Sequence, residues 1–309
     1  TRWKPWVGWV SASECAGSRG VCSAMKSAST PRSSSRSTPQ ALSTDQYESS
    51  PVFSPDGREL MFFRAPPAFD RYRLRMSRCE NGQWSEAREP AFSGPDAALE
   101  TDPAYSPDGR WLYYASDRAN AGDLDIWRVA RGSDGQWGEP ERLPGPVNSP
   151  QTELLPRPLA DGRLLFGSHR PGGIGGRDLY FATPRGDGHW EVEPLPAPVN
   201  TAGDEYEADL SRDGRVLVVV AHRGVRSHLY VYDLDADGWH ERGRVPARED
   251  VFQVGPLLSP DAKRLLFAQA DGPASGEFFL VELAPGSDPA WPPACASPYE
   301  GARHGGESR

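Results

Sequence analysis

The chain of 309 residues contains only four cysteines, and none of them forms a Cys-x-x-Cys motif. A dense disulfide scaffold and the common zinc and redox motifs are therefore excluded. The chain also lacks an apolar run as long as a membrane-spanning helix or the core of a signal peptide requires. We expect no transmembrane segment and no signal peptide within the given sequence.

Sequence signatures of catalysis are absent as well. Neither Gly-x-Ser-x-Gly nor His-Glu-x-x-His occurs, which excludes the common hydrolase elbow and the common zinc-protease helix. The histidines are not spaced as a metal-binding set. The glycine-rich segment 170–176 lacks the Lys-Ser/Thr ending of a phosphate-binding loop. We therefore predict no catalytic residue, no metal site and no cofactor.

What the chain does contain is a long repeat. The phrase Phe-Ser-Pro-Asp-Gly-Arg, or a variant of it, occurs five times, and its aspartates are 52, 53, 52 and 48 residues apart. These turn aspartates are Asp56, Asp108, Asp161, Asp213 and Asp261. A fixed period of this size predicts units that bury their apolar faces against their neighbours.

Each repeat unit predicts four β-strands. Short runs of β-branched and aromatic residues, bounded by Gly, Pro and Asp, indicate strands and not helices. Pro-Asp-Gly between the first two runs is typical of a tight turn, because proline presets φ and glycine accepts a positive φ. Four antiparallel strands per unit, repeated around an axis, predict an all-β fold of the β-propeller type. Five blades are readable, and five or six could close the ring.

Three phrases carry a resemblance to a known family. They are Glu-x-x-Pro-x-Phe-Ser-Pro-Asp-Gly-Arg-x-Leu, Ser-x-Arg-Pro-Gly-Gly-x-Gly-Gly-x-Asp-Leu-Tyr at 168–180, and Pro-Val-Asn at 146–148 and 198–200. Together they resemble the WD40-like, or PD40, repeats of TolB-type propellers over residues 41–293. Arg212 and Ala262 depart from the pattern, since they replace the proline and the glycine of the turn. The resemblance implies an exported, periplasmic protein of a bacterium, and no defined activity.

The two ends of the chain differ from the repeats. Ser, Thr and Pro make up ten of the fourteen residues from Ser27 to Gln40, so residues 1–40 are predicted to be a disordered leader. Residues 294–309 are expected to form a flexible tail. The segment 41–46 aligns with the end of a repeat unit, and we expect it to pair with the last blade and close the ring.

The four cysteines leave two pairings open. Cys15 and Cys22 lie in the leader, where they either close a small loop or stay free. Cys79 follows a predicted strand of the first unit, and Cys295 lies near the end of the chain. A bridge between Cys79 and Cys295 requires that the first and last units adjoin.

The net charge of −9 is unevenly distributed. Residues 1–40 carry six Lys or Arg against one acid, a net +5, so the remainder carries −14. An acidic propeller is not expected to bind nucleic acid, because phosphate contacts need clustered Lys and Arg. The acidic body instead favours solubility or a basic partner. We expect a monomer.

A glutamate lies eight residues before the turn aspartate in four units, namely Glu48, Glu100, Glu153 and Glu205. Because the first strand of a blade lines the channel, we expect these carboxylates to form a ring near one mouth, able to receive a cation or a basic peptide. The alternative is structural, since an arginine follows the second strand in the same units. Glu–Arg pairs between neighbouring blades would then satisfy both charges.

Two functional hypotheses follow. The first is a non-enzymatic binding or scaffold propeller of the bacterial cell envelope, which recognises a protein or peptidoglycan-linked partner through a channel mouth or blade loops. The second is a propeller-fold glycan lyase or hydrolase that uses channel-mouth carboxylates. Trp137 and Trp190 occupy the same place in successive units, and we expect both to pack between blades.

Overall fold

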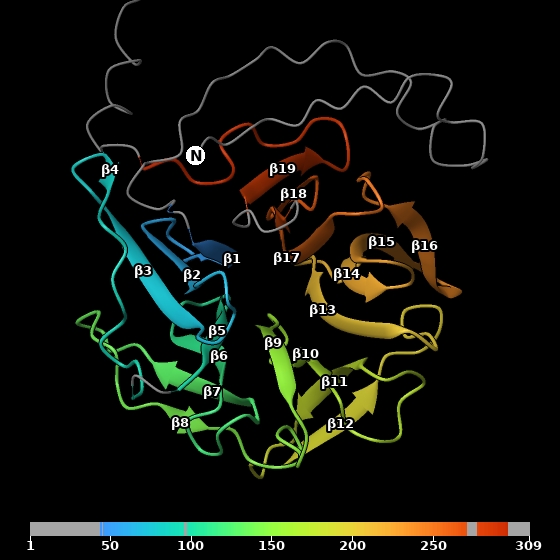
Figure 1. Cartoon of the computed structure of the whole chain (residues 1–309), viewed down its shortest axis with the longest axis horizontal. Coiled ribbons are helices and arrows are strands. Elements are labelled where there is room, and N and C mark those ends of the chain that lie inside the picture. The colour runs from blue at the N-terminus through green and yellow to red at the C-terminus, as the bar shows by residue number, and fades with distance from the viewer. Residues whose placement is uncertain (1–43, 45, 96–97, 271–276, 296–309) are drawn as a thin grey trace, which may run out of the picture.

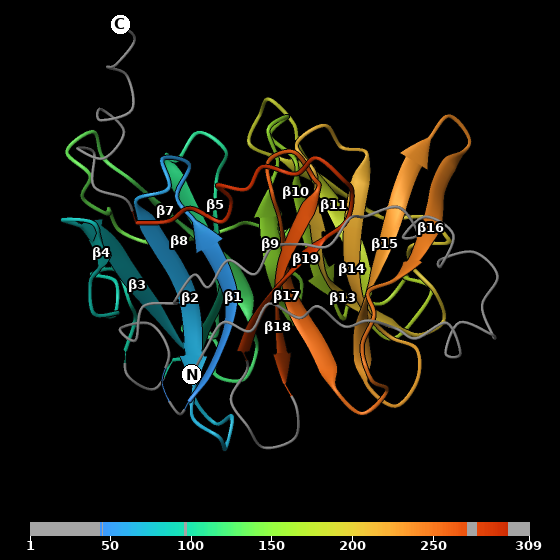
Figure 2. The same ribbon diagram turned by 90° about the horizontal axis from the view of Figure 1, so that it is seen from above.

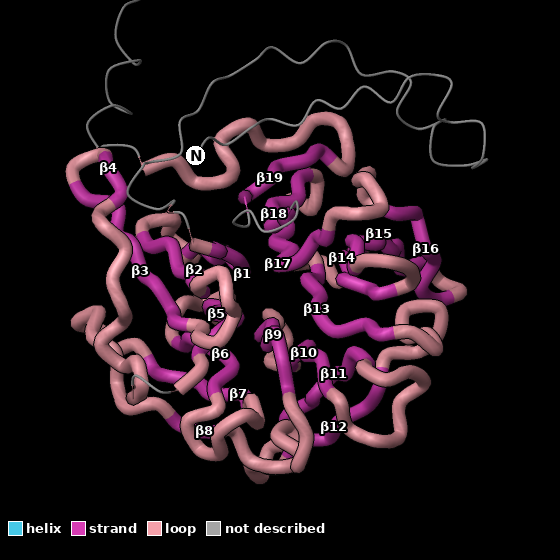
Figure 3. The backbone as a smooth tube through the Cα atoms, viewed as in Figure 1, coloured by secondary structure: helices cyan, strands magenta, loops and turns pink. Residues whose placement is uncertain are grey.

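A computed structural model describes residues 44, 46–95, 98–270 and 277–295, and these residues form five β-sheets arranged as a ring (Figure 1). The predicted all-β propeller is confirmed, with five blades. In the part of the chain that the structure describes, every regular element is a strand (Figure 3), and no helix has the length and apolarity to cross a membrane. The expected leader, Cys15, Cys22 and most of the expected tail lie outside the described residues.

Within each blade the strands pair in sequence order and antiparallel, as the predicted hairpins require. Blade 1 consists of β1 (Tyr47–Phe53), β2 (Glu59–Ala65), β3 (Arg73–Glu80) and β4 (Gln83–Trp84). Blade 2 consists of β5 (Glu100–Tyr105), β6 (Trp111–Ser116), β7 (Asp125–Ala130) and β8 (Glu141–Arg142). Blade 3 consists of β9 (Glu153–Pro158), β10 (Leu164–Ser168), β11 (Asp178–Pro184) and β12 (Trp190–Pro194).

The last two blades differ in size. Blade 4 consists of β13 (Asp204–Leu210), β14 (Val216–His222), β15 (Ser227–Asp235) and β16 (Gly238–Arg244). Blade 5 consists of β17 (Phe252–Leu258), β18 (Arg264–Ala270) and β19 (Glu277–Glu282). Among the described residues, blade 5 thus has three strands where the other blades have four.

The repeated phrase forms the turn between the first two strands of each blade. In blade 1 the Ser54 hydroxyl and the backbone N–H of Arg58 both donate hydrogen bonds to the Asp56 carboxylate, at 2.5 and 3.1 Å. Gly57 follows with a φ of 69°, a conformation that a residue without a Cβ adopts at little cost. The turn aspartates therefore have the structural role that the sequence predicts.

The innermost strand of every blade contains a register shift typical of a β-bulge. The shift comes directly after the glutamate in blade 4 and one residue later in blades 1, 2 and 3, and it comes one residue after Gln253 in blade 5. In four blades the residue two places after the glutamate or Gln253 has a positive φ, namely Ser50, Asp102, Leu155 and Gly255. Because a bulge bends and twists a strand, it turns these short strands around the propeller axis.

Aromatic side chains fill the space between blades. Trp190 packs on a cluster that contains Tyr113 of blade 2 and Tyr180 of blade 3. Trp137 contacts Tyr105 of blade 2 and Phe92, which lies in the link from blade 1, with ring centroids 6.2 and 5.4 Å apart. The expected packing between blades is therefore observed for both tryptophans.

The first and last blades adjoin, and a disulfide joins them. In Figures 1 and 2, β1 lies beside β17. A bond between Cys79, at the end of β3, and Cys295 ties blade 1 to the segment that follows blade 5, with Cα atoms 5.2 Å apart. The pairing that the sequence left open is thus present. The expected pairing of segment 41–46 lies mostly outside the described residues, which include only Thr44 and Gln46 of it.

Candidate functional site

The four glutamates of the predicted ring lie at or near the start of the innermost strands, and all four are buried. Each one pairs with the arginine at the end of the second strand of its own blade or just after it. The distance is 2.8 Å from Arg64 to Glu48 and 3.1 Å from Arg170 to Glu153. The expectation that these Glu–Arg pairs join neighbouring blades is therefore wrong, because the two strands pair directly and bring both residues together within one blade.

Further hydrogen bonds enclose the same carboxylates. The hydroxyl of Ser149 donates to Glu153 at 2.6 Å, and that of Thr201 donates to Glu205 at 2.7 Å. Burial raises the pKa of Glu153, and the hydrogen bonds from Ser149 oppose this rise. Binding of a cation or basic peptide by the glutamate ring stays a prediction, and the structure gives each carboxylate a partner from its own blade.

A second polar cluster lies closer to the propeller axis, and the sequence analysis did not identify it. It consists of Asp102, Arg157, Glu207 and Asp209, which we call the axial cluster. Asp102 accepts a hydrogen bond from Ser50 of blade 1 at 3.0 Å. The other two carboxylates accept bonds of 2.6 Å from backbone N–H groups of blade 5, Glu207 from Gly255 and Asp209 from Leu258. These bonds cross blade boundaries.

Arg157 of blade 3 completes the axial cluster. It donates to the backbone carbonyls of Pro103 in blade 2 and Pro256 in blade 5, at 3.5 and 3.3 Å. Its Nε lies 3.5 Å from Asp209 Oδ1 in blade 4. One buried arginine thus reaches three blades, so the axial cluster joins all five blades by polar contacts.

The axial cluster holds three carboxylates and one guanidinium group, and the pKa values of its carboxylates are raised. Burial and the negative charge of Asp102 raise the pKa of Glu207 to about 8. Burial also raises the pKa of Asp102 and of Asp209, and Arg157 opposes both rises. Because like charges held together favour proton uptake, Glu207 retains its proton in most molecules near neutral pH.

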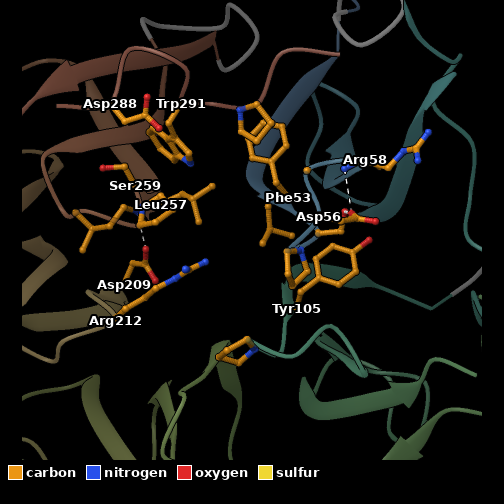
Figure 4. A pocket seen from close by; sticks show the side chains of 18 of the residues that line it. Phe53, Asp56, Arg58, Tyr105, Asp209, Arg212, Leu257, Ser259, Asp288 and Trp291 are labelled. Carbon is orange, nitrogen blue, oxygen red and sulfur yellow. Dashed lines mark hydrogen bonds between the residues drawn. The ribbon is translucent and has the colours of Figure 1, made fainter. Parts of the chain in front are cut away.

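A pocket of about 760 Å³ opens at the end of the propeller where the Pro-Asp-Gly turns lie (Figure 4). The turns of blades 1, 2, 4 and 5 line it, together with segment 288–294 after the last blade. Asp209 also contributes to the lining, so the pocket reaches the axial cluster. Its larger apolar side chains include Phe53, Tyr105, Leu257 and Trp291.

Comparisons with known proteins support the fold. No family model matches the chain, and no curated protein matches it. Among solved structures, TolB from Acinetobacter baumannii aligns with a TM-score of 0.52 and 18% identity, over 78% of this chain and 53% of that chain. The fold is that of a TolB-like propeller. The tricorn protease aligns with a TM-score of 0.48 and 17% identity, over 79% of this chain and 22% of that chain.

This chain spans about half the length of TolB. At such low sequence identity the likeness to TolB concerns the architecture, so the pocket of this TolB-like propeller has to be interpreted from its own residues. One of them, Arg212, departs from the repeat, because it stands where the turns of blades 1, 2 and 5 have proline.

Arg212 places a positive charge in the pocket. Its side chain is exposed and points toward the open middle of the pocket in Figure 4. Among the described residues it forms no ion pair. The acidic residues of the lining already accept hydrogen bonds: Asp56 from its own turn, Asp209 from Leu258, and Asp288 from the N–H of Ala290 at 2.8 Å. The pocket therefore combines aromatic walls with the available guanidinium group of Arg212, which points toward its middle.

Proposed function

We propose that this propeller is a non-enzymatic binding scaffold of the bacterial cell envelope, and that its turn-end pocket receives a segment of a partner protein, including one linked to peptidoglycan. The observation that carries the proposal is the pocket itself. It is built from the turns of four blades, has aromatic walls and contains the unpaired Arg212.

The chemistry of the pocket suits a protein segment. Aromatic and arginine side chains dominate the binding energy of protein interfaces, because they combine a large apolar area with hydrogen bonding. Loops held by a rigid scaffold are also the usual place for recognition. A partner segment with an apolar side chain for the aromatic walls and a carboxylate for Arg212 would match the pocket.

Two features support a location outside the cytoplasm. The Cys79–Cys295 disulfide persists in oxidising compartments such as the periplasm and is rare in cytosolic proteins. The TolB-like fold agrees with the family resemblance of the repeat phrases. These features support our proposal of a periplasmic or otherwise exported location.

The glycan lyase or hydrolase alternative has less support. It requires carboxylates that can reach a substrate, whereas the four glutamates are buried in ion pairs and the pocket carboxylates accept hydrogen bonds from nearby groups. Among the described residues that line the pocket there is also no histidine to transfer a proton.

The proposal is tested by cross-linked capture from a bacterial envelope extract, with the purified chain as bait. Arg212→Glu should lose the captured partner because it reverses the charge inside the pocket. Arg71→Glu is the matched control, since Arg71 is an exposed arginine in the β2–β3 connection at the opposite end of the blade. Equal capture by both variants would refute binding at this pocket. Turnover of a glycan panel by the wild-type protein would favour the enzyme instead.

A further inference from the structure

The end of the propeller opposite the pocket carries exposed apolar side chains. Among the described residues, the large apolar side chains that are exposed are Val225 at 75%, Ile174 at 53% and Phe69 at 42%. All three lie in connections between the second and third strands of a blade, at the lower end in Figure 2. Phe69 packs edge-on against the ring of Tyr47, so Val225 and Ile174 are the most open of the three.

The two open side chains belong to neighbouring blades, and contacts join the connections that carry them. The guanidinium group of Arg177 lies over the Tyr206 ring, 5.3 Å from its centroid. The side chain of Ser227, which directly follows the second connection, interacts with the hydroxyl of Tyr206. The connections 169–177 and 223–226 therefore lie side by side, and we call them together the basic tip surface.

The basic tip surface differs in charge from the rest of the molecule. It contains four arginines and no aspartate or glutamate, whereas residues 41–309 together carry −14. Arg170 and Arg223 pair with the buried glutamates of their own blades. Arg177 and Arg226 form no ion pair in the part of the chain that the structure describes. Two guanidinium groups are therefore available beside the two apolar tips.

Three acidic side chains lie near this surface and leave it positively charged. Glu249 and Asp250, in the β16–β17 link, already pair with other arginines at 2.6 and 2.9 Å. Arg226 acts on Asp250 more weakly than that partner does. Asp204 is half-buried at the start of β13. An anionic ligand thus meets arginines before it meets an unpaired carboxylate.

We propose that the basic tip surface docks on an anionic lipid bilayer, with Val225 and Ile174 inserted at the boundary of the acyl chains and the arginines on the lipid phosphates. Apolar burial and Coulomb attraction add together in this kind of interfacial binding. The turn-end pocket then faces away from the bilayer. The proposal does not depend on what that pocket binds.

The shape of the surface favours a bilayer over a protein partner. A stable protein interface buries about 800 Å² per partner around a contiguous apolar centre. Here two aliphatic side chains protrude from separate loops, and Ile174 is flanked by glycines that add no side chain to such a centre. A flat bilayer can meet both tips at once. An acidic partner protein and the acidic body of a second copy are the competing occupants.

Vesicle sedimentation tests the proposal with the full chain. The wild type should bind vesicles made of phosphatidylglycerol and phosphatidylcholine in equal parts, and should bind pure phosphatidylcholine much more weakly. Arg226→Gln should lower the partition coefficient about fivefold, as expected for one arginine near an anionic surface. Ile174→Ser combined with Val225→Ser should lower it as well, because the inserted apolar area is lost.

Arg215→Gln is the matched control for charge. Arg215 is an exposed arginine of blade 4 in the turn at the opposite end, outside the lining of the pocket. This variant should bind like the wild type. Equal binding by all variants would show that another part of the chain, such as the basic residues 1–40, holds the lipid, and would overturn the proposal. A wild type that self-associates or stays free in the presence of anionic vesicles would overturn it too.

A fluorescent label separates insertion from attraction to the surface. In a Cys15→Ser, Cys22→Ser background, Val225→Cys carries an environment-sensitive nitrobenzoxadiazole group. Its emission should rise and shift to the blue on the anionic vesicles. The same label on Asp187→Cys, in the exposed β11–β12 turn at the opposite end, should not respond. Equal responses at the two positions, or no response at position 225 in protein that sediments with vesicles, would overturn insertion of the tips.

Discussion

Ala262 departs from the repeat at a position where the backbone conformation is strained for a residue with a Cβ. The other four turns have glycine at the equivalent position, with φ between 69° and 87°, and Ala262 adopts a φ of 54°. A left-handed conformation costs a residue that has a Cβ about 1–2 kcal/mol. Replacement by glycine removes this strain. The gain in stability is partly offset, because glycine also gives the unfolded chain roughly 0.5–1 kcal/mol more conformational freedom.

We therefore expect Ala262→Gly to raise the free energy of unfolding by up to about 1 kcal/mol, measured by urea denaturation. Gly214→Ala is the reverse control, because Gly214 has a φ of 72° and a Cβ added there would meet open space. It should lower the free energy of unfolding by about 1 kcal/mol or more. Opposite signs for the two changes support backbone strain at Ala262, and equal signs argue against it.

Glu207 makes the stability of the ring depend on pH. Its pKa is about 8 in the folded protein, against a usual value of 4.5. The folded state therefore holds a proton that the unfolded state releases. The stabilisation from this proton is fully present below the usual pKa and is lost as the pH rises through the folded pKa.

Glu207→Gln should remove this pH dependence, since glutamine keeps an acceptor for the Gly255 N–H and does not ionise. Urea midpoints of the wild type should fall as the pH rises from about 5 to about 8, and those of the variant should fall less. Glu139→Gln, on the exposed surface, controls for the change in net charge. Parallel profiles for wild type and Glu207→Gln would contradict the assignment.

At the scale of the element, the innermost and second strands of a blade are joined by a buried ion pair as well as by backbone hydrogen bonds. Glu100 is the clearest case, because Arg118 of its own blade and Arg73 of blade 1 both lie next to it. Removal of one partner from a buried pair leaves an uncompensated charge and costs about 3–5 kcal/mol.

Glu100→Gln should therefore lower the free energy of unfolding by about 3 kcal/mol and leave partner capture per folded molecule unchanged. The double variant Glu100→Gln, Arg118→Met should recover part of the lost free energy of unfolding, because the buried charge of Arg118 is then removed too. If Glu100→Gln left stability unchanged and abolished capture, the carboxylate ring would be the binding site instead of the turn-end pocket.

The elements also show what the sequence can predict. The period of the turn aspartates predicts the strands, their hairpins and the propeller, because each repeat encodes these features locally. The axial cluster was missed because its members break the repeat. Ser50, Leu155 and Gly255 occupy the places of Asp102 and Glu207 in the other blades, and Val52, Ala104 and Leu257 occupy the places of Arg157 and Asp209. Only the bulges bring these unlike side chains to one axis. The pocket was missed for a similar reason, since four turns and a distant segment form it.

At the scale of the whole molecule, contacts at three places keep the ring together. The axial cluster links the blades at the centre, aromatic clusters fill the space between blades, and the Cys79–Cys295 disulfide spans the junction of the first and last blades. The disulfide also anchors segment 288–294, which forms one wall of the pocket. Ring closure and the turn-end pocket are therefore coupled through one covalent bond.

Replacement of both Cys79 and Cys295 by serine should therefore weaken the fold and the pocket together. The bridged residues are 216 positions apart, and a loop of this length restricts the unfolded chain by up to roughly 5 kcal/mol. We expect a lower urea midpoint and reduced partner capture by the folded protein, because the wall that contains Trp291 is no longer anchored. A reducing agent should reproduce both effects in a Cys15→Ser, Cys22→Ser protein and add nothing to the variant that lacks the bridge. If reduction and substitution both left the midpoint unchanged, non-covalent contacts between blades 1 and 5 would be sufficient to close the ring.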